Sequence, residues 1–163
     1  MENNKYPKRK AMRLQKYDYS LPGAFFVTIC TKDKAKIFWL PVGRDDLGAP
    51  HTLSRYGRIV EKFIASIPEA YPGVTAEKYV IMPNHVHMIV SISYERNDGA
   101  PGSSRPTLSQ VIGAMKRLSN KDAGIKLWQT SFYEHIIRSE DDYRAIWQYI
   151  ETNPARWEHD EYC

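Results

Sequence analysis

Cysteine is scarce in this chain, which has only Cys30 and Cys163 among its 163 residues. Cys30 falls within an apolar run and Cys163 is the last residue, so the pair does not indicate a disulfide-built domain. Long apolar runs are also lacking, since none approaches the roughly 18 residues of a membrane span. No signal-peptide core follows the basic N-terminal stretch. We therefore expect a protein of the reducing cytoplasm that has no membrane partner.

The chain has no large excess of charge of one sign, because its formal net charge is only +4. With 42% hydrophobic and 26% charged residues, it has the composition of an ordinary globular protein, and we expect one domain over residues 1–163. The basic residues are nevertheless crowded into residues 1–16. The candidate phosphate-contacting cations there are Lys8, Arg9, Lys10, Arg13 and Lys16. A phosphate-contacting arm and a solvated tail both fit this pattern.

The first half of the chain predicts three strands and one helix. Gly23 to Thr31 is rich in β-branched and aromatic residues and follows a turn signal, which indicates a strand, expected to be central. Apolar residues from Leu53 to Ile67 have the spacing of one long amphipathic helix, stopped by Pro72-Gly73. Strands are then expected over residues 75–82 and 85–91, joined by a tight turn at Pro83-Asn84.

The second half predicts two helices separated by an extended segment. Thr107 with Gln110 forms a capping-box signature for a helix that carries Lys116 and Arg117 near its end, where cations suit the helix dipole and are further candidates for contact with phosphate. Residues 126–139 indicate a strand or extended segment, and Ser139 can cap the last helix, which Pro154 ends or kinks. This order of elements predicts an α+β fold in which helices pack on a ferredoxin-like antiparallel sheet.

Two histidines at the start of the expected 85–91 strand are the first candidate functional residues. Because side chains alternate along a strand, His85 and His87 project from the same face, while Val86 and Met88 turn into the core. Two imidazoles so placed can share a metal ion, although a surface-facing pair that is only solvated or hydrogen-bonded has the same pattern. We expect this face to look outward.

Tyr149 and Asn153 are the second pair of candidates, four residues apart on the last expected helix. That spacing stacks both side chains on one helical face, at the border of an apolar stripe that includes Trp147 and Ile150. A tyrosine there can simply pack, and Asn153 can simply end the helix before proline. Together with the histidines, however, an amide oxygen gives three protein ligands and leaves open positions, as a catalytic metal requires. A tyrosine oxygen could then attack a phosphodiester.

These motifs in combination resemble the single-tyrosine HUH transposases, and most closely their REP-associated branch. The resemblance rests on the histidine pair after MPNH, on YIETNP at 149–154, on WQTSFYEHIIR at 128–138 and on the opening RLQKYDYSLPGAFFVTICT at 13–31. It covers about Arg13 to Trp157. The histidine triplet alone is a weak signal, whereas its combination with the tyrosine motif is specific.

The resemblance implies an HUH endonuclease fold and an enzyme that cleaves and rejoins single-stranded or hairpin DNA. Tyr149 would be the nucleophile that keeps the 5′ phosphate, and His85, His87 and Asn153 would hold Mg²⁺ or Mn²⁺. His135 and Arg138 are secondary candidates that match the family-like YEHIIR run, with a structural role as the alternative for each. The family leaves open whether the protein works as a monomer or as a homodimer.

Two other functions are compatible with the sequence. One is a protein that binds hairpin DNA without cleaving it. The other is a metal-dependent phosphohydrolase in which Tyr149 only packs and water attacks the phosphorus. Detection of a covalent adduct between protein and DNA would distinguish the endonuclease from both the hairpin-binding protein and the phosphohydrolase.

Overall fold

The computed structural model describes residues 21–41, 51–93 and 105–159. The basic arm, including Lys8, Arg9, Lys10, Arg13 and Lys16, lies outside the described residues, so its expected role stays a prediction. The elements in chain order are β1 (Gly23–Cys30), η1 (Lys32–Lys34), α1 (Arg55–Ala65), α2 (Ile67–Ala70), β2 (Val74–Ile81), β3 (His85–Ile92), α3 (Leu108–Ala123), β4 (Tyr133–Ile137), α4 (Glu140–Thr152) and η3 (Asn153–His159).

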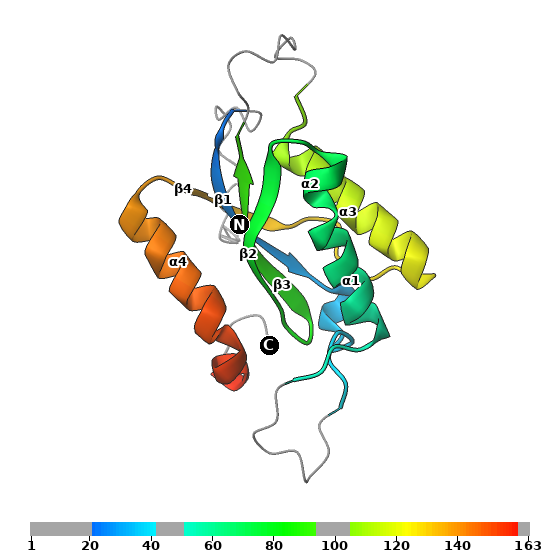
Figure 1. Cartoon of the computed structure of the whole chain (residues 1–163). Helices are drawn as coiled ribbons and strands as arrows, with labels where there is room; N and C mark the ends of the chain where they lie inside the picture. The colour runs from blue at the N-terminus through cyan, green and yellow to red at the C-terminus, as the bar shows by residue number, and fades with distance from the viewer. Residues whose placement is uncertain (1–20, 42–50, 94–104, 160–163) are drawn as a thin grey trace, which may run out of the picture.

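The four strands form one antiparallel sheet in the order β2-β3-β1-β4. β1 is central, as its apolar sequence indicated, because it pairs with both β3 and β4. Figure 1 shows the sheet running through the middle of the molecule, with helices on either side. The predicted α+β fold with a ferredoxin-like sheet is therefore confirmed.

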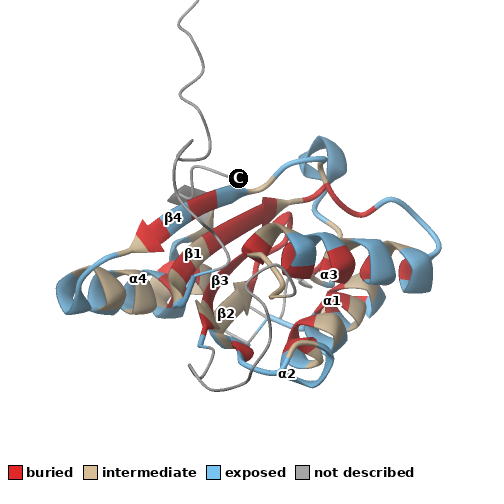
Figure 2. Cartoon of the chain, turned by 90° about the horizontal axis from the view of Figure 1, so that it is seen from above, coloured by how far each residue is buried: buried red, intermediate tan, exposed pale blue. Residues whose placement is uncertain are grey.

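The helices cover the two faces of the sheet unequally. Figure 2 shows α1 and α3 on one face and α4 alone on the other. Alternate β1 residues Phe25, Val27 and Ile29 are fully buried in the core cluster that includes the apolar residues of α1 and α3. The other β1 residues, such as Phe26 and Thr28, face α4 because side chains alternate along a strand. The site described below lies on that second face.

Short polar residues begin the main helices, as the sequence predicted. The side chain of Thr107 accepts a hydrogen bond from the Gln110 N–H, and the Gln110 side chain accepts one from the Thr107 N–H, which completes the capping box of α3. Ser139 accepts a hydrogen bond from the Asp142 N–H at the start of α4. Gly124 ends α3 at φ 72°, in the left-handed region that favours glycine.

The prediction of a single long helix between Leu53 and Ile67 is wrong. Ser54 caps α1, so Leu53 lies before the helix, and α1 ends at Ala65. The separate short helix α2 follows, with Pro68 in its first turn. Proline lacks an N–H and its ring clashes with the carbonyl four residues earlier, so it is tolerated at a helix start and not inside one. The proline thus divides the apolar stripe into two helices.

Candidate metal and tyrosine site

His85 and His87 lie side by side at the start of β3, where they pair with Cys30 and Thr28 of β1. Their Nε2 atoms are 3.1 Å apart, so both rings aim the same nitrogen at one point. The two ring centroids are 4.5 Å apart. The predicted projection of both histidines from one face of the strand is confirmed.

The expectation that this face looks outward is wrong, because His85 and His87 are both 0% exposed. Alternation along a strand shows which side chains share a face, but not what covers that face. Here the Phe26 ring stacks on His87 at a centroid distance of 5.3 Å, and α4 crosses above. The pair therefore lies in a site with restricted access to water.

Each histidine is oriented by a hydrogen bond at its other nitrogen. His85 Nδ1 donates to Asn84 Oδ1 at 2.7 Å, because a carbonyl oxygen can only accept. His87 Nδ1 is 2.8 Å from Thr28 Oγ1. Partners of this kind fix ring orientation in protein metal sites. With Nδ1 engaged in both rings, the Nε2 atoms are the ones that remain for a ligand.

Tyr149 brings its hydroxyl to this pair from α4. Its oxygen is 3.4 Å from His87 Nε2, and its ring meets those of Phe26 and His87 edge to face. The residue as a whole is still 39% exposed, while its hydroxyl lies beside the buried pair. Tyr149 thus packs as an aromatic residue and also presents its oxygen beside the histidines.

Asn153 follows one turn later, at the end of α4. Its side chain is only 4% exposed, and its Oδ1 has no hydrogen-bond partner among the described residues. The residues four positions away on either side both reach the histidines, since Tyr149 contacts His87 and the Trp157 ring lies 6.3 Å from that of His85. A buried amide oxygen without a partner is costly. A bound cation would satisfy it.

The donor set fits a divalent metal ion. Two imidazole nitrogens bound to one ion at about 2.0–2.1 Å are themselves separated by roughly 2.9–3.4 Å, and the observed separation is 3.1 Å. The described residues contain no cluster of three His, Cys, Asp or Glu side chains that could hold a metal, so the candidate third donor among them is an oxygen other than a carboxylate. Asn153 Oδ1 has that chemistry.

The secondary candidates His135 and Arg138 are not at the histidine pair. His135 Nε2 lies 2.9 Å from Asp142 Oδ2, which joins β4 to the first turn of α4. Arg138 is exposed between β4 and α4. The contact of His135 favours the structural alternative for that residue.

The two predicted DNA-contacting residues of α3 lie on the sheet face opposite Tyr149 (Figure 2). Lys116 Nζ donates to the carbonyls of Gln129 and Thr130, at 2.6 and 3.0 Å, and so holds the segment before β4. Burial, together with neighbouring Lys126, lowers the pKa of Lys116. Arg117 is exposed. Lys116 therefore has a structural contact that its sequence position did not indicate.

Thr28 and Asn84 are site residues that sequence reasoning missed. Asn84 carried a signal, since it directly precedes His85 in the turn between β2 and β3. No sequence signal indicated Thr28, because its hydroxyl meets His87, 59 residues away, only through the pairing of β1 with β3.

Comparisons with known proteins relate this chain to transposases. No protein-family model matches it. An uncharacterized protein of Haemophilus influenzae is 34% identical over 94% of this chain and 92% of its own length. The REP-associated tyrosine transposase of Escherichia coli is 33% identical over 79 residues, which is 48% of this chain and 42% of that protein. The chain thus matches less than half the length of this second relative.

One solved structure has the same fold. It is a REP-associated tyrosine transposase bound to a REP hairpin, and it matches with a TM-score of 0.61 over 89% of this chain and 74% of that chain, at 20% identity. The chain therefore belongs to one family with the Haemophilus influenzae protein, and the resemblance to the REP-associated tyrosine transposases that its motifs indicated is confirmed.

Proposed function

We propose that this chain is a metal-dependent single-stranded DNA endonuclease and transposase that cleaves and rejoins hairpin-containing DNA through a 5′-phosphotyrosine intermediate. The observation that carries the proposal is the position of the Tyr149 hydroxyl, 3.4 Å from Nε2 of His87, in a pair of histidines whose Nε2 atoms are 3.1 Å apart. A tyrosine hydroxyl and a pair of histidines thereby meet within one chain, and the buried Asn153 amide follows Tyr149 one helical turn later.

His85, His87 and Asn153 would hold Mg²⁺ or Mn²⁺ through Nε2, Nε2 and Oδ1. Imidazole donors favour Mn²⁺ on ligand preference, while Mg²⁺ prefers oxygen. The bound ion would act as a Lewis acid on the phosphodiester and would favour ionisation of the nearby phenol, whose usual pKa is about 10. Thr28 and Asn84 would keep the two rings in position.

Tyr149 performs the strand transfer in this proposal. Its oxygen attacks phosphorus, a tyrosine O–P bond forms, and the bond to the 3′ oxygen breaks, so that the leaving strand takes a proton and ends in a 3′ hydroxyl. Rejoining is the reverse: a 3′ hydroxyl attacks the phosphotyrosine, and Tyr149 leaves. The partial exposure of Tyr149 supports this role, because DNA can reach the oxygen while the histidines stay buried.

The proposed partner is single-stranded or hairpin DNA, as in the related structure that was solved with a REP hairpin. A DNA substrate of this kind places the protein in the cytoplasm, at the nucleoid. No helix among the described residues is both long and apolar enough to span a bilayer. We propose that the site is assembled within one chain, as a catalytic monomer in which Tyr149 meets His87, with a homodimer that exchanges helices as the alternative.

A covalent adduct tests the proposal. A labelled hairpin oligonucleotide incubated with the protein and Mn²⁺ should give a denaturation-resistant protein–DNA adduct, which Tyr149→Phe abolishes. Tyr56→Phe, on α1 in the opposite layer, is the matched control and should keep the adduct. Cleavage without any adduct would favour the phosphohydrolase, and binding without cleavage would favour the hairpin-binding protein.

A further inference from the structure

Three aromatic rings form a cluster beside the histidine pair, and the proposed chemistry does not use them. We define the ring cluster as Trp39, His51 and Trp157. The Trp39 and His51 rings are stacked, with centroids 3.8 Å apart and planes 15° apart, and the Trp39 and Trp157 centroids are 6.1 Å apart. Trp157 is also the ring that borders His85, at 6.3 Å. The cluster therefore continues directly from the candidate site.

The backbone around the ring cluster is held by main-chain contacts. Trp39 Nε1 donates to the Ile81 carbonyl at 2.7 Å, and Trp39 forms an isolated antiparallel bridge with Leu53. The Leu40 N–H donates to the Thr52 carbonyl at 2.9 Å, one residue after His51. These bonds fix Trp39 beside the turn that leads into β3. Its ring is thus oriented before any ligand arrives.

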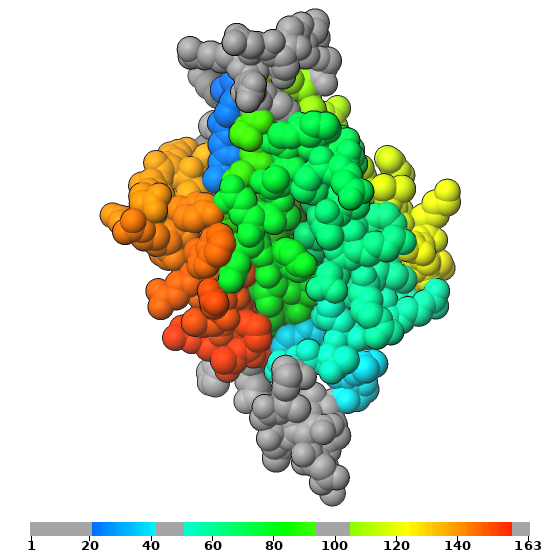
Figure 3. Space-filling model, in the orientation of Figure 1, coloured from blue at the N-terminus to red at the C-terminus, as the bar shows by residue number. Residues whose placement is uncertain are grey.

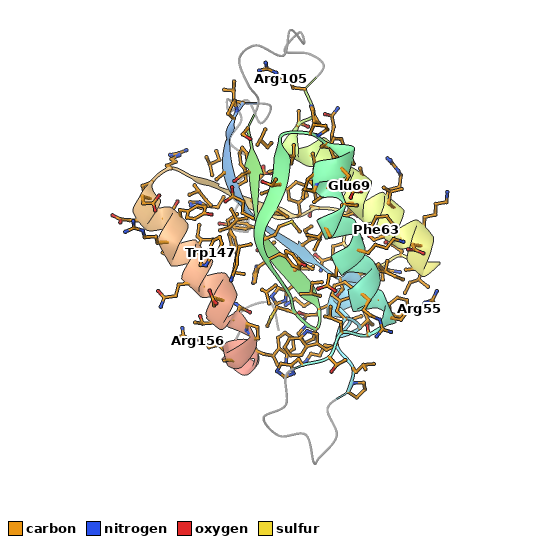
Figure 4. All side chains as sticks on the ribbon, in the orientation of Figure 1. Arg55, Phe63, Glu69, Arg105, Trp147 and Arg156 are labelled. Atoms are coloured by element: carbon orange, nitrogen blue, oxygen red, sulfur yellow. The ribbon has the colours of Figure 1, made fainter. Side chains whose placement is uncertain are left out.

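Several positive side chains lie close in sequence to the residues of the ring cluster, and one of them contacts it. Lys32, Lys34 and Lys36 are all exposed on the segment after β1, where Asp33 is the one carboxylate. Lys36 Nζ lies 5.1 Å from the centroid of the Trp157 ring. Arg156, which is exposed and labelled in Figure 4, precedes Trp157 in η3. Aromatic faces interleaved with cations have the chemistry that binds unpaired nucleic acid, since bases stack on the rings and phosphates contact the cations.

We propose that the ring cluster, with Lys36, binds an unpaired nucleotide next to the phosphate that reacts at Tyr149. This inference rests on the proposed function, because it names how the same site holds its substrate. His51 already occupies one face of the Trp39 indole at van der Waals distance, and the Trp39 and Trp157 planes are 50° apart, so in this proposal the base stacks on Trp157. The Lys36 ammonium, near the same ring, contacts the backbone phosphate. Stacking is tolerant of sequence, so the ring cluster contributes affinity for any unpaired base.

Binding without cleavage tests this inference. All variants are made in Tyr149→Phe and assayed in EDTA with a short fluorescent oligothymidine, so the reaction cannot influence the result. Trp157→Ala should weaken binding by about five- to a hundredfold, and Trp157→Phe should retain most of it. Trp147→Ala is the matched control, because Trp147 is also half-buried and also has a lysine near its ring, with Lys78 Nζ at 4.8 Å. It should bind as tightly as its parent.

The salt dependence of the same binding tests the role of Lys36. Lys36→Ala should reduce the slope of log affinity against log salt by about 0.7, the value of one phosphate contact on a single strand. Lys62→Ala is the control, since Lys62 Nζ lies 4.8 Å from the Phe63 centroid on α1, the opposite layer. Its slope should be unchanged.

Photocrosslinking gives a readout that does not depend on the folding of a variant. Oligothymidine carrying 5-iodouracil should crosslink to tryptic peptides 37–44 or 157–163, at Trp39 or Trp157. Unchanged affinity in Trp157→Ala together with crosslinks elsewhere would overturn the inference, even if the native protein forms a covalent adduct. Loss of affinity in Trp157→Ala together with crosslinks at Trp39 or Trp157 would support nucleotide binding by the ring cluster. This holds even if the native protein forms no covalent adduct, because the lack of an adduct contradicts only the proposed function.

Discussion

His87 is the residue on which the candidate site converges. Its Nε2 faces both His85 Nε2 and the Tyr149 hydroxyl, its Nδ1 bonds to Thr28, and its ring stacks on Phe26. A fully buried imidazole with this many directed contacts has one ring orientation. The site is therefore organised before DNA or metal arrives, which reduces the free energy of reorganisation in the reaction.

Removing either histidine should abolish metal-dependent cleavage while preserving DNA binding. In His85→Ala and His87→Ala we expect at least about a hundredfold slower cleavage, because each change removes one of the three proposed protein ligands. Binding of a hairpin oligonucleotide in EDTA should change by less than about twofold. His135→Ala is the control, since His135 bonds to Asp142 away from the pair. An equal loss of binding and cleavage would contradict the assignment.

Removing the Thr28 hydroxyl should weaken metal binding without removing a proposed metal ligand. Thr28→Val keeps the shape of the side chain but leaves His87 Nδ1 without its partner, so we expect about 10- to 100-fold weaker Mn²⁺ binding. Titration of Mn²⁺ followed by electron paramagnetic resonance measures this directly. Thr75→Val, at an exposed position of β2, is the matched control. Equal Mn²⁺ affinity in both variants would exclude a role for Thr28.

At the scale of elements, α4 is attached to the sheet mainly by polar and aromatic contacts along β2. Ile150 is its one buried residue. Tyr143 donates to Glu77 at 2.5 Å, Lys78 bonds to Glu151 at 3.1 Å, and Figure 3 shows α4 and β2 in contact along their length. Because α4 carries Tyr149, these contacts with an edge strand set the position of the nucleophile.

The Tyr143 contact should make stability depend on alkaline pH. Desolvation, with the hydrogen bond to Glu77, raises the pKa of Tyr143 from 10.0 to about 12. The unfolded chain then loses this proton before the folded one does, so the contribution is complete below pH 10 and is lost as the pH rises to about 12. Between pH 9 and pH 11, the free energy of urea unfolding should fall further for the native protein than for Tyr143→Phe, by roughly 0.5 kcal/mol because solvent screens this largely exposed group. Parallel losses in the two proteins would show that this contact does not titrate.

Local signals predicted the elements well, because the determinants were within a few residues of each other. Thr107 with Gln110 and Ser139 with Asp142 are such pairs, and both begin helices. The division between α1 and α2 shows where the hydrophobic pattern was insufficient, since Pro68 ends a helix that the apolar spacing continues. A local steric rule overrides the periodicity at that position.

At the scale of the whole molecule, the site depends on contacts that no local pattern contains. Tyr149 meets His87 across 62 residues, and Thr28 meets it across 59. Sequence spacing placed His85 and His87 on one face and Tyr149 with Asn153 on another. That the two faces would close on each other, and so bury the histidines, follows from packing of α4 on the sheet. Resemblance to a family, rather than periodicity, indicated this closure.

The single-chain site predicts how mixed variants behave. A mixture of His85→Ala and Tyr149→Phe should remain inactive at any concentration, because each chain lacks one part of its own site. If two protomers exchanged α4, the mixture would regain part of the native cleavage. A mixture of each variant with native protein controls for inhibition by the variants. Restored cleavage in the mixed variants would contradict a site assembled within one chain.

Peptide mapping of the covalent adduct tests the central claim most directly. Trypsin cleaves after Arg144 and Arg156, so Tyr149 is the only tyrosine of the peptide Ala145–Arg156, while Tyr143 lies in Ser139–Arg144. After reaction with a hairpin oligonucleotide and Mn²⁺, tandem mass spectrometry should find the nucleotide on Ala145–Arg156, attached through the 5′ phosphate of the strand downstream of the cut. Attachment to another peptide, or attachment through a 3′ phosphate, would contradict Tyr149 as the nucleophile beside His85 and His87.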